Sequence, residues 1–182
     1  MLDICLLGTG GMMPMPSRFL TAMLARLNGR LALIDCGEGT QVTMKMLGWG
    51  FKAIDVICFT HFHADHISGL PGLLLTIGNA GRTEPLMLIG PVGLQRIVEG
   101  LTLIAPELPF PIEYIELTQD APNPIRVGAF EIHHCPADHM VKCFAYRIDL
   151  KRKGKFDVKK AEQLKLPKPL WNKLQKEGSV EH

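Results

Sequence analysis

The sequence contains no apolar run near the roughly 20 residues that a membrane-crossing helix needs. The first residues, Met1-Leu2-Asp3, lead directly into an apolar strand pattern without a basic leader. The chain also has no internal repeat, and its formal net charge is only +2. We therefore expect a cytoplasmic globular protein without a membrane segment, and 182 residues suffice for one domain or slightly more.

Paired cysteines are absent as well. The chain has an odd number of cysteines, and they are widely spaced with no CxxC pair. The five are Cys5, Cys36, Cys58, Cys135 and Cys143. Most of them fall in apolar strand-like segments, which predicts reduced thiols in the core. A cysteine zinc ligand is the alternative, but histidines already supply candidate ligands.

Histidine is scarce, but three of the seven histidines fall within six positions. The run His61-Phe62-His63-Ala64-Asp65-His66 directly follows the apolar strand pattern 53–59. If the strand continues through His61 and His63, its period of two places both side chains on the same face, and Asp65 and His66 lie where the chain turns toward a helix. Imidazole and carboxylate suit zinc, and also manganese or iron. The pattern predicts a site for one or two metal ions rather than a histidine-rich surface loop.

Two further residues are candidates for the same site. His139 lies in the loop 136–140 after a strand pattern, from which it can reach the first cluster, and an exposed loop histidine is the alternative. His133 and His134 are expected to be strand residues, one of them facing inward. Asp35, at the end of the strand pattern 31–34, is expected either to orient a ligand histidine through its second ring nitrogen or to cap the following helix.

Acidic residues are rare near the C-terminus. Between Lys151 and Lys176 the chain has ten Lys and Arg residues and only two acids. Such a segment is typical of contact with a nucleic-acid backbone, and a solubilising tail is the alternative. Residues 158–166 have helical spacing, and the prolines that follow are expected to end this helix. Trp171 could then stack on a base or pack against its own domain.

The rest of the chain alternates strand and helix patterns. The dipeptide Asn28-Gly29 predicts a hairpin turn between two of the strands. Mixed sheets with helices packed outside them are the expected layers. Strands are expected at 2–7, 21–27, 31–34, 53–59, 86–89, 112–117, 129–134 and 144–150, and helices at 41–47, 69–77 and 92–103.

The run HFHADH resembles the HxHxDH signature of the metallo-β-lactamase fold, which by itself indicates a metal-dependent hydrolase or relative. Further stretches narrow the resemblance to the ribonuclease Z family of tRNA 3′-processing endonucleases. They are Gly8-Thr9-Gly10, the segment DCGEGTQ at 35–41, GLPGLL at 69–74, Ile89-Gly90-Pro91 and the loop bearing His139. The resemblance covers nearly the whole chain and implies an α/β fold, a metallo-β-lactamase-like αββα sandwich of mixed sheets with outer helices.

The resemblance also implies roles for individual residues. His61, His63 and His139 bind one zinc ion, and Asp65 and His66 help to bind a second. Asp65 is also the implied catalytic proton acceptor. A metal-activated water then cleaves precursor tRNA at its 3′ end and leaves a 3′-hydroxyl on the tRNA. A homodimer is implied, because in this family the arm of one subunit serves the site of its partner.

By the same resemblance, residues 1–150 are the N-terminal part of the catalytic domain and residues 151–182 are the start of a tRNA-binding arm. The implied substrate-binding residues are Arg18, Lys151, Arg152, Lys153 and Lys155. The family's metal-bridging aspartate and last histidine ligand lie downstream of this sequence, so we expect the N-terminal portion of a longer protein. We accordingly expect the second metal position to be empty or partly filled.

Two alternatives to this assignment remain. One is a metal-dependent phosphodiesterase or other ester hydrolase of the same fold, and the other is a catalytically incomplete fragment that binds metal or RNA. The loop 14–19 departs from the family pattern PxKxRN, in which only Pro14 and Arg18 fit. In the arm, Lys168-Pro169 replaces a common Gly-Pro pair.

Overall fold

The computed structural model describes residues 2–13, 15–105, 107–150 and 156–177. The chain divides into two compact units, residues 1–149 and residues 150–182. Within the described residues, no helix is both long enough and apolar enough to cross a bilayer.

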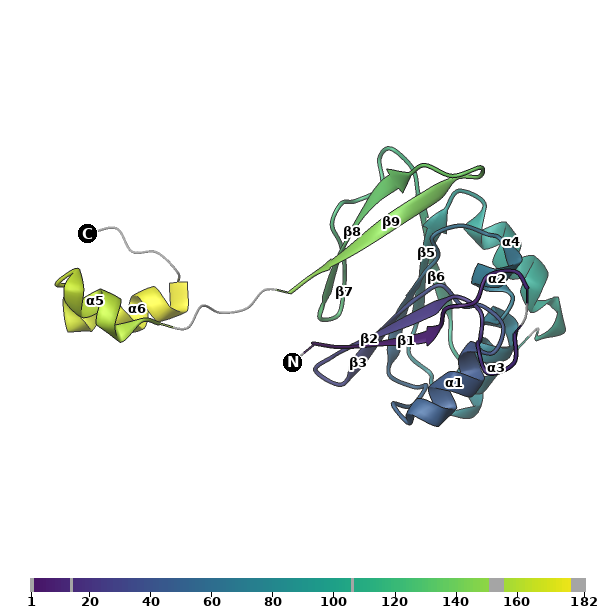
Figure 1. The fold of residues 1–182 in the computed structure, drawn as a ribbon, viewed down its shortest axis with the longest axis horizontal. Coiled ribbons are helices and arrows are strands. Elements are labelled where there is room, and N and C mark those ends of the chain that lie inside the picture. The colour runs from purple at the N-terminus through teal and green to yellow at the C-terminus, as the bar shows by residue number, and fades with distance from the viewer. Residues whose placement is uncertain (1, 14, 106, 151–155, 178–182) are drawn as a thin grey trace. The chain divides into compact units, whose positions relative to one another are not determined.

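The first unit is built on a mixed sheet of six strands in the order β1-β2-β3-β4-β5-β6 (Figure 1). The first three strands pair antiparallel, whereas β3 to β6 run parallel to one another. The predicted hairpin is confirmed, because Asn28 and Gly29 both have positive φ angles and join β2 to β3. The strands are β1 (Leu2–Gly8), β2 (Ala22–Leu27), β3 (Arg30–Ile34), β4 (Ile54–Cys58), β5 (Leu86–Pro91) and β6 (Ile112–Leu117).

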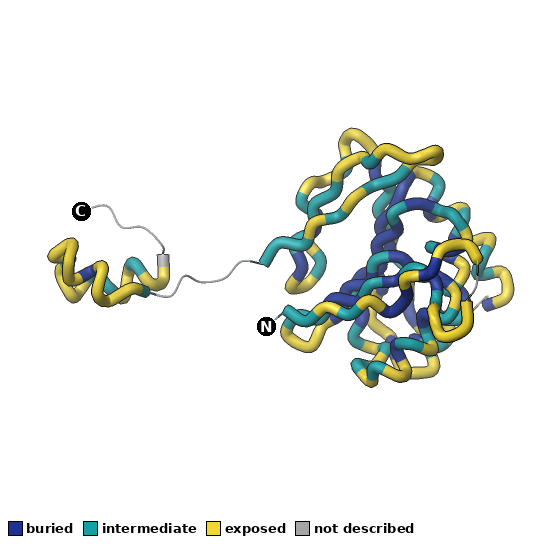
Figure 2. The backbone as a smooth tube through the Cα atoms, in the orientation of Figure 1, coloured by how far each residue is buried: buried dark blue, intermediate teal, exposed yellow. Residues whose placement is uncertain are grey.

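Helices cover one face of this sheet (Figure 1). They are α1 (Thr40–Leu47), α2 (Ala64–Ile67), α3 (Leu70–Asn79) and α4 (Leu94–Leu101), and the 3-10 turn η1 (Thr102–Ile104) follows α4. In α3 the side chains at 70, 73, 74 and 77 are fully buried, which is the i, i+3, i+4, i+7 spacing of a helix that packs one face against a core. Figure 2 shows the buried residues concentrated along the central strands and the inner sides of these helices.

A second, antiparallel sheet covers the opposite face of the first sheet. It consists of β7 (Ile125–Val127), β8 (Phe130–Ala137) and β9 (Cys143–Asp149). Phe130 and Ile132 pack against Val56 and Ile89 of the first sheet. The unit therefore has three layers, which correspond to helix, sheet and sheet of the predicted αββα sandwich. Among the described residues of this unit, no helix forms a fourth layer.

Two hydrogen bonds tie β9 to the chain that leaves β4. The Tyr146 hydroxyl donates to the carbonyl oxygen of Phe59 at 2.7 Å, and the Phe144 amide donates to the carbonyl oxygen of Thr60 at 2.9 Å. They fix the β8–β9 hairpin next to the residues that follow β4.

Several details differ from the sequence-based expectations. The strand does not continue through His61, because β4 ends at Cys58 and the Thr60 amide donates to the Asp35 side chain instead of to a neighbouring strand. The helix expected at 92–103 is shorter, and β7 was not predicted. Cys36 and Cys58 are buried free thiols as expected, but Cys135 is an exposed free thiol.

The second unit contains two short helices, α5 (Val158–Gln163) and α6 (Lys168–Glu177). Asp157 caps α5 by accepting from the Lys160 amide at 3.0 Å. The segment expected only to end a helix also begins a second one, because Pro169 falls in the first turn of α6, where its missing amide is tolerated. Trp171 donates its indole N–H to the carbonyl oxygen of Leu166 at 3.0 Å, and its ring lies 5.5 Å from that of Phe156. The tryptophan therefore packs within its own unit.

Candidate metal centre

Close backbone contacts hold the HFHADH run in place after β4. The Cys36 amide donates to the carbonyl oxygen of His66 at 2.7 Å, and the Gly69 amide donates to the carbonyl oxygen of Cys36 at 2.9 Å. A Cβ atom on Gly37 would lie 2.4 Å from the carbonyl oxygen of Asp65, so a larger residue does not fit there. The glycine-containing segment after β3 therefore fixes the backbone of α2 and of the loop before it.

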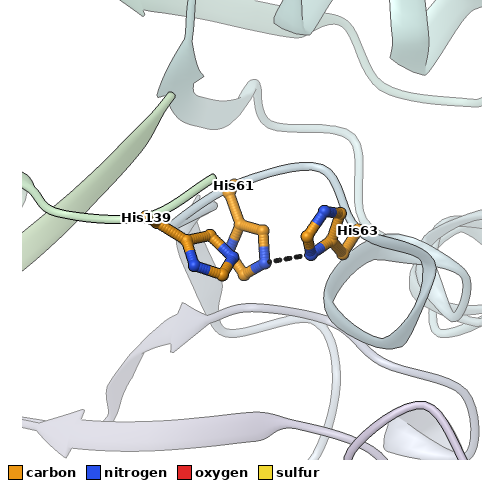
Figure 3. Close-up of side chains that lie close together, drawn as sticks. All are labelled: His61, His63 and His139. Carbon is orange, nitrogen blue, oxygen red and sulfur yellow. Dashed lines mark hydrogen bonds between the residues drawn. The ribbon is translucent and has the colours of Figure 1, made fainter. Parts of the chain in front are cut away.

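Three imidazole rings converge at this place (Figure 3). His61 and His63 come from the loop after β4, and His139 comes from the loop that joins β8 to β9. His61 Nε2 lies 3.1 Å from His63 Nδ1, and the His139 ring centroid lies 4.6 Å from that of His61 and 5.2 Å from that of His63. Each ring offers one nitrogen within 4.8 Å of the other two. Histidines far apart in the sequence thus face a common point.

The donor set fits a divalent metal ion. Burial and, after it, the neighbouring rings of His66 and His63 together lower the pKa of His61 to about 4. His61 is therefore uncharged at neutral pH, which is the form that binds a metal. Three imidazole nitrogens facing one point are typical of zinc sites that keep a coordination position open for water or substrate.

Asp65 and His66 form a second pair of donors beside the three imidazoles. Asp65 Oδ2 lies 3.6 Å from His66 Nε2, and the ring centroids of His66 and His61 are 4.1 Å apart. Asp65 is buried, and the His66 side chain is only 18% exposed. Burial opposes charge on His66, but the hydrogen bond from its ring to Asp35 and the charges of Asp35 and Asp65 outweigh that effect and raise its pKa.

Asp35 lies behind these side chains and is buried. Its carboxylate accepts from the Thr60 amide, from the Thr60 hydroxyl and from His66 Nδ1, each at 2.8 Å. The backbone of Asp35 has a φ of 58°, a left-handed conformation that aspartate tolerates better than most residues. Asp35 does not cap the following helix, whose N-cap Gly39 has no side-chain partner. Thr60 was not singled out from the sequence, where its only signal is its position directly before His61.

The residues expected to contact substrate are less fully described. Arg18 donates from Nε to the Thr9 hydroxyl at 3.1 Å and from a terminal nitrogen to the Thr9 carbonyl oxygen at 2.9 Å. It lines a cavity of about 480 Å³ together with Ser68 and Gly69, which follow α2. A second cavity, of about 890 Å³, reaches His139. Lys151, Arg152, Lys153 and Lys155 lie outside the described residues.

Glu131, His133 and Asp149 form another group whose donor atoms lie within 4.8 Å of one another. Their carboxylates already have cationic partners, because Arg126 pairs with Glu131 at 3.1 Å and Arg147 pairs with Asp149 at 2.9 Å. His133 Nε2 lies 3.2 Å from Asp149 Oδ2. We interpret this group as an ion-pair network on β8 and β9 rather than as a second metal site.

Comparison with known proteins identifies relatives over nearly the whole chain. The chain is 57% identical over 175 residues to "Ribonuclease Z" of Lachnospira eligens, which covers 96% of this chain and 57% of the relative. It is 58% identical over 176 residues to "Ribonuclease Z" of Clostridium kluyveri, which covers 97% of this chain and 58% of the relative. The chain thus spans somewhat less than three fifths of the length of these curated relatives.

Solved structures support the same fold. Human tRNase Z, short form, superimposes with a TM-score of 0.71 at 29% identity, over 82% of this chain and 65% of that chain. The metallo-β-lactamase fold protein YhfI from Bacillus subtilis superimposes with a TM-score of 0.66 at 22% identity, over 81% of this chain and 58% of that chain. The predicted metallo-β-lactamase-like α/β fold is therefore confirmed.

A family model described as "Anti-Pycsar protein Apyc1" matches residues 2–98, which is more than half of the 182 residues. This range contains the stretch Gly8-Thr9-Gly10, Asp35 and the HFHADH run. The chain therefore belongs to the family that this model describes, has the metallo-β-lactamase fold, and counts bacterial proteins named ribonuclease Z among its homologues.

Proposed function

We propose that this protein is a zinc-dependent endoribonuclease that cleaves precursor tRNA at its 3′ end and leaves a 3′-hydroxyl on the tRNA. The observation that carries the proposal is the convergence of His61, His63 and His139 beside Asp65 and His66. The identity to proteins named ribonuclease Z supports the choice of substrate.

In the proposed reaction, His61, His63 and His139 would hold one zinc ion, and Asp65 and His66 would contribute to a second position. Bound zinc supplies the Lewis acidity that such a hydrolysis needs. Asp65 takes up a proton from the attacking water, whose oxygen bonds to the scissile phosphorus. The bond between phosphorus and the tRNA 3′ oxygen breaks, so the 3′ trailer keeps the phosphate. The 3′ oxygen takes up a proton from solvent to become the hydroxyl, and Asp65 returns its proton to solvent.

The proposal extends to substrate contacts and assembly. Arg18 and the cations Lys151, Arg152, Lys153 and Lys155 bind phosphates of the tRNA, with residues 151–182 acting as the start of an arm. The protein acts in the cytoplasm as a homodimer, with up to two zinc ions per complete site. Multi-angle light scattering on the purified protein tests the dimer, and a monomer mass at assay concentration contradicts it.

The central experiment is a cleavage assay on precursor tRNA labelled at its 5′ end. Purified protein with zinc is expected to make one cut, and the labelled product is expected to accept a nucleotide at its 3′ end without phosphatase treatment. Asp65→Asn is expected to lower the rate by roughly 100-fold or more, because it removes a carboxylate positioned for proton transfer. Absence of zinc-dependent cleavage, or an unchanged rate in a folded Asp65→Asn variant, contradicts the proposal.

A second candidate function is hydrolysis of a small phosphodiester. The family model favours keeping this candidate, because its description names a protein other than ribonuclease Z. The test is hydrolysis of bis(p-nitrophenyl) phosphate with and without precursor tRNA as a competitor. If this ester is cleaved efficiently while tRNA neither binds nor competes, the second candidate replaces the first.

A further inference from the structure

The hydroxyl of Thr60 lies between the buried carboxylate of Asp35 and two of the candidate ligand histidines. Thr60 Oγ1 is 2.8 Å from Asp35 Oδ2, 2.9 Å from His61 Nδ1 and 3.4 Å from His66 Nδ1. Among the described residues, the other polar neighbour of His61 Nδ1 is the Cys143 sulfur, a weak partner at 4.0 Å. Thr60 therefore contacts the side of the His61 ring that faces away from His63.

The positions of the protons in this group follow from which atoms can donate a hydrogen bond and which can only accept one. A carboxylate only accepts hydrogen bonds, so the 2.8 Å contact between Thr60 Oγ1 and Asp35 Oδ2 requires the hydroxyl proton to point at Asp35. With that proton used, Thr60 Oγ1 can only accept from His61 Nδ1. His66 Nδ1 lies 2.8 Å from Asp35 Oδ2, closer than to the hydroxyl, so its proton goes to the carboxylate.

In its uncharged form each ring then carries its single proton on Nδ1 and leaves Nε2 free to bind a metal ion. In His61 that nitrogen faces His63 Nδ1 at 3.1 Å, and in His66 it faces Asp65 Oδ2 at 3.6 Å. These are the two places where the donors of the candidate metal centre converge. One buried carboxylate can thus set the ring of one ligand directly and that of another through a hydroxyl.

The backbone holds Thr60 in position for this role. Its amide donates to Asp35 Oδ1 at 2.8 Å, and its carbonyl oxygen accepts from the Phe144 amide of β9 at 2.9 Å. Both backbone groups of Thr60 therefore have a partner, which keeps the residue beside Asp35 and His61.

We propose that Thr60 is a positioning residue of the metal centre. Its hydroxyl donates a hydrogen bond to Asp35, accepts one from His61 Nδ1, and thereby fixes the Nδ1–H tautomer of His61. We call this pair of hydrogen bonds the relay. This inference rests on the proposed metal centre but not on the identity of the substrate. It differs from a purely structural role because it assigns a proton to one nitrogen of one ring.

The direct test is a long-range ¹H–¹⁵N correlation spectrum of the metal-free, ¹⁵N-labelled protein, which distinguishes protonated from unprotonated ring nitrogens. Signals of His61 are assigned by their loss in His61→Gln. At a pH where both rings are uncharged, we expect His61 and His66 to be Nδ1–H tautomers in the wild type. In Thr60→Val, His61 is expected to become a mixture of its two tautomers. The tautomer of His66 is expected to stay the same, because Asp35 contacts His66 directly. Thr60→Ser is expected to keep the wild-type tautomer.

Zinc affinity, measured by competition with a chelator, provides the second readout. We expect Thr60→Val to weaken zinc binding by about 10–100-fold, the range for loss of a group that orients a ligand. Thr60→Ser restores the affinity, and Thr102→Val is a control, since the Thr102 hydroxyl bonds to the Val98 carbonyl oxygen away from the centre. In an Asp35→Asn background, Thr60→Val is expected to weaken zinc binding by a smaller factor than in the wild type, because both substitutions break the same relay.

An Nε2–H tautomer of His61 in the wild type overturns the proposal, and this measurement needs no variant to fold. An unchanged His61 tautomer in Thr60→Val overturns it as well, as does full additivity of the two substitutions. If the tautomers are as expected but the protein does not cleave precursor tRNA, the proposed function fails while the relay stands.

Discussion

Of the five candidate metal ligands, His139 alone is exposed. Its position nevertheless depends on well-paired structure, because Ala137 and Cys143 pair across the hairpin that carries it. The Phe144 amide then joins this hairpin to Thr60, one residue before His61. The two ends of the loop that carries His139 are thus fixed by backbone pairing, although the His139 residue itself is exposed.

We expect His139→Ala to weaken zinc binding by more than roughly 100-fold, since loss of a group that only orients a ligand already costs about 10–100-fold. The matched control is His134→Ala, whose ring lies 5.9 Å from Phe144 and bonds to the Pro122 carbonyl oxygen at 3.2 Å instead of facing the other imidazoles. The measurement is chelator competition at neutral pH, with circular dichroism as the check on folding. Equal losses in both variants, or no loss in His139→Ala, exclude His139 from the metal site.

At this scale the sequence predicted the site unevenly. Residues 61–66 are contiguous, so their proximity needed no knowledge of the fold. His139 was a candidate from its place in a loop after a strand pattern, but residue spacing left an exposed loop histidine as the alternative, and the family resemblance favoured the ligand role. Thr60 was missed, since a hydroxyl between two side chains becomes a relay only when tertiary structure brings Asp35 to it.

At the scale of elements, the site depends on the backbone contact between the segment after β3 and the start of α2 and α3. A Cβ on Gly37 would lie 2.4 Å from the Asp65 carbonyl oxygen, and one on Gly69 would lie 2.2 Å from the Gly37 carbonyl oxygen. Both obstacles are backbone atoms, which cannot move aside as the end of a flexible side chain can. Small residues are therefore needed where these two segments cross.

We predict that Gly37→Ala lowers the free energy of unfolding by about 1–3 kcal/mol or more, because the added methyl group must displace backbone. It is also expected to weaken zinc binding, since the displaced carbonyl belongs to Asp65. Gly100→Ala in α4 is the matched control, because a Cβ there meets nothing within 4 Å. The control is expected to raise stability by up to about 1 kcal/mol, as replacement of a helical glycine does. Urea unfolding of the metal-free proteins measures the free energy of unfolding of both variants. A Gly37→Ala variant as stable as the wild type contradicts the prediction.

Most elements could be predicted from periodicity and turn residues, and the errors have physical causes. The strand β4 ends before the histidines because the Thr60 amide donates its hydrogen bond to the Asp35 side chain instead of to a neighbouring strand. The strand β7 has three residues, too few for an alternating pattern to be recognised. Proline at 169 was taken only as a helix end, although the first turn of a helix accepts it.

At the scale of the whole molecule, the α/β class followed from the alternating patterns, whereas the metallo-β-lactamase-like sandwich followed from the family resemblance. Alternating strands and helices indicate an α/β protein, but they do not say that β7 to β9 form a separate sheet stacked on the first. That arrangement is what carries the histidine loop of the hairpin to the end of β4.

The second unit is basic and has a small apolar interior. Ala161 is buried, and Phe156, Leu170 and Trp171 are partly buried. All of its described lysines are exposed, and they are Lys159, Lys160, Lys165, Lys168, Lys173 and Lys176. Neutralising such residues leaves the interior intact, so their effect on RNA binding can be measured without unfolding the unit.

We predict that replacing Lys159 and Lys160 with glutamine weakens binding of precursor tRNA and makes the dependence of log affinity on log salt less steep. The slope is expected to change by up to about 0.9 for each phosphate that the substituted side chains no longer neutralise. The matched control replaces Lys45 and Lys52, two exposed lysines of the first unit. Glutamine has nearly the helix propensity of lysine, so helix stability changes little in either pair. Affinity is measured by fluorescence anisotropy with a chelator present, at several salt concentrations. The prediction is contradicted if replacing Lys159 and Lys160 leaves the slope unchanged, or if replacing Lys45 and Lys52 reduces the slope equally. Either result means that the second unit contributes only general charge and makes no specific contact with the RNA.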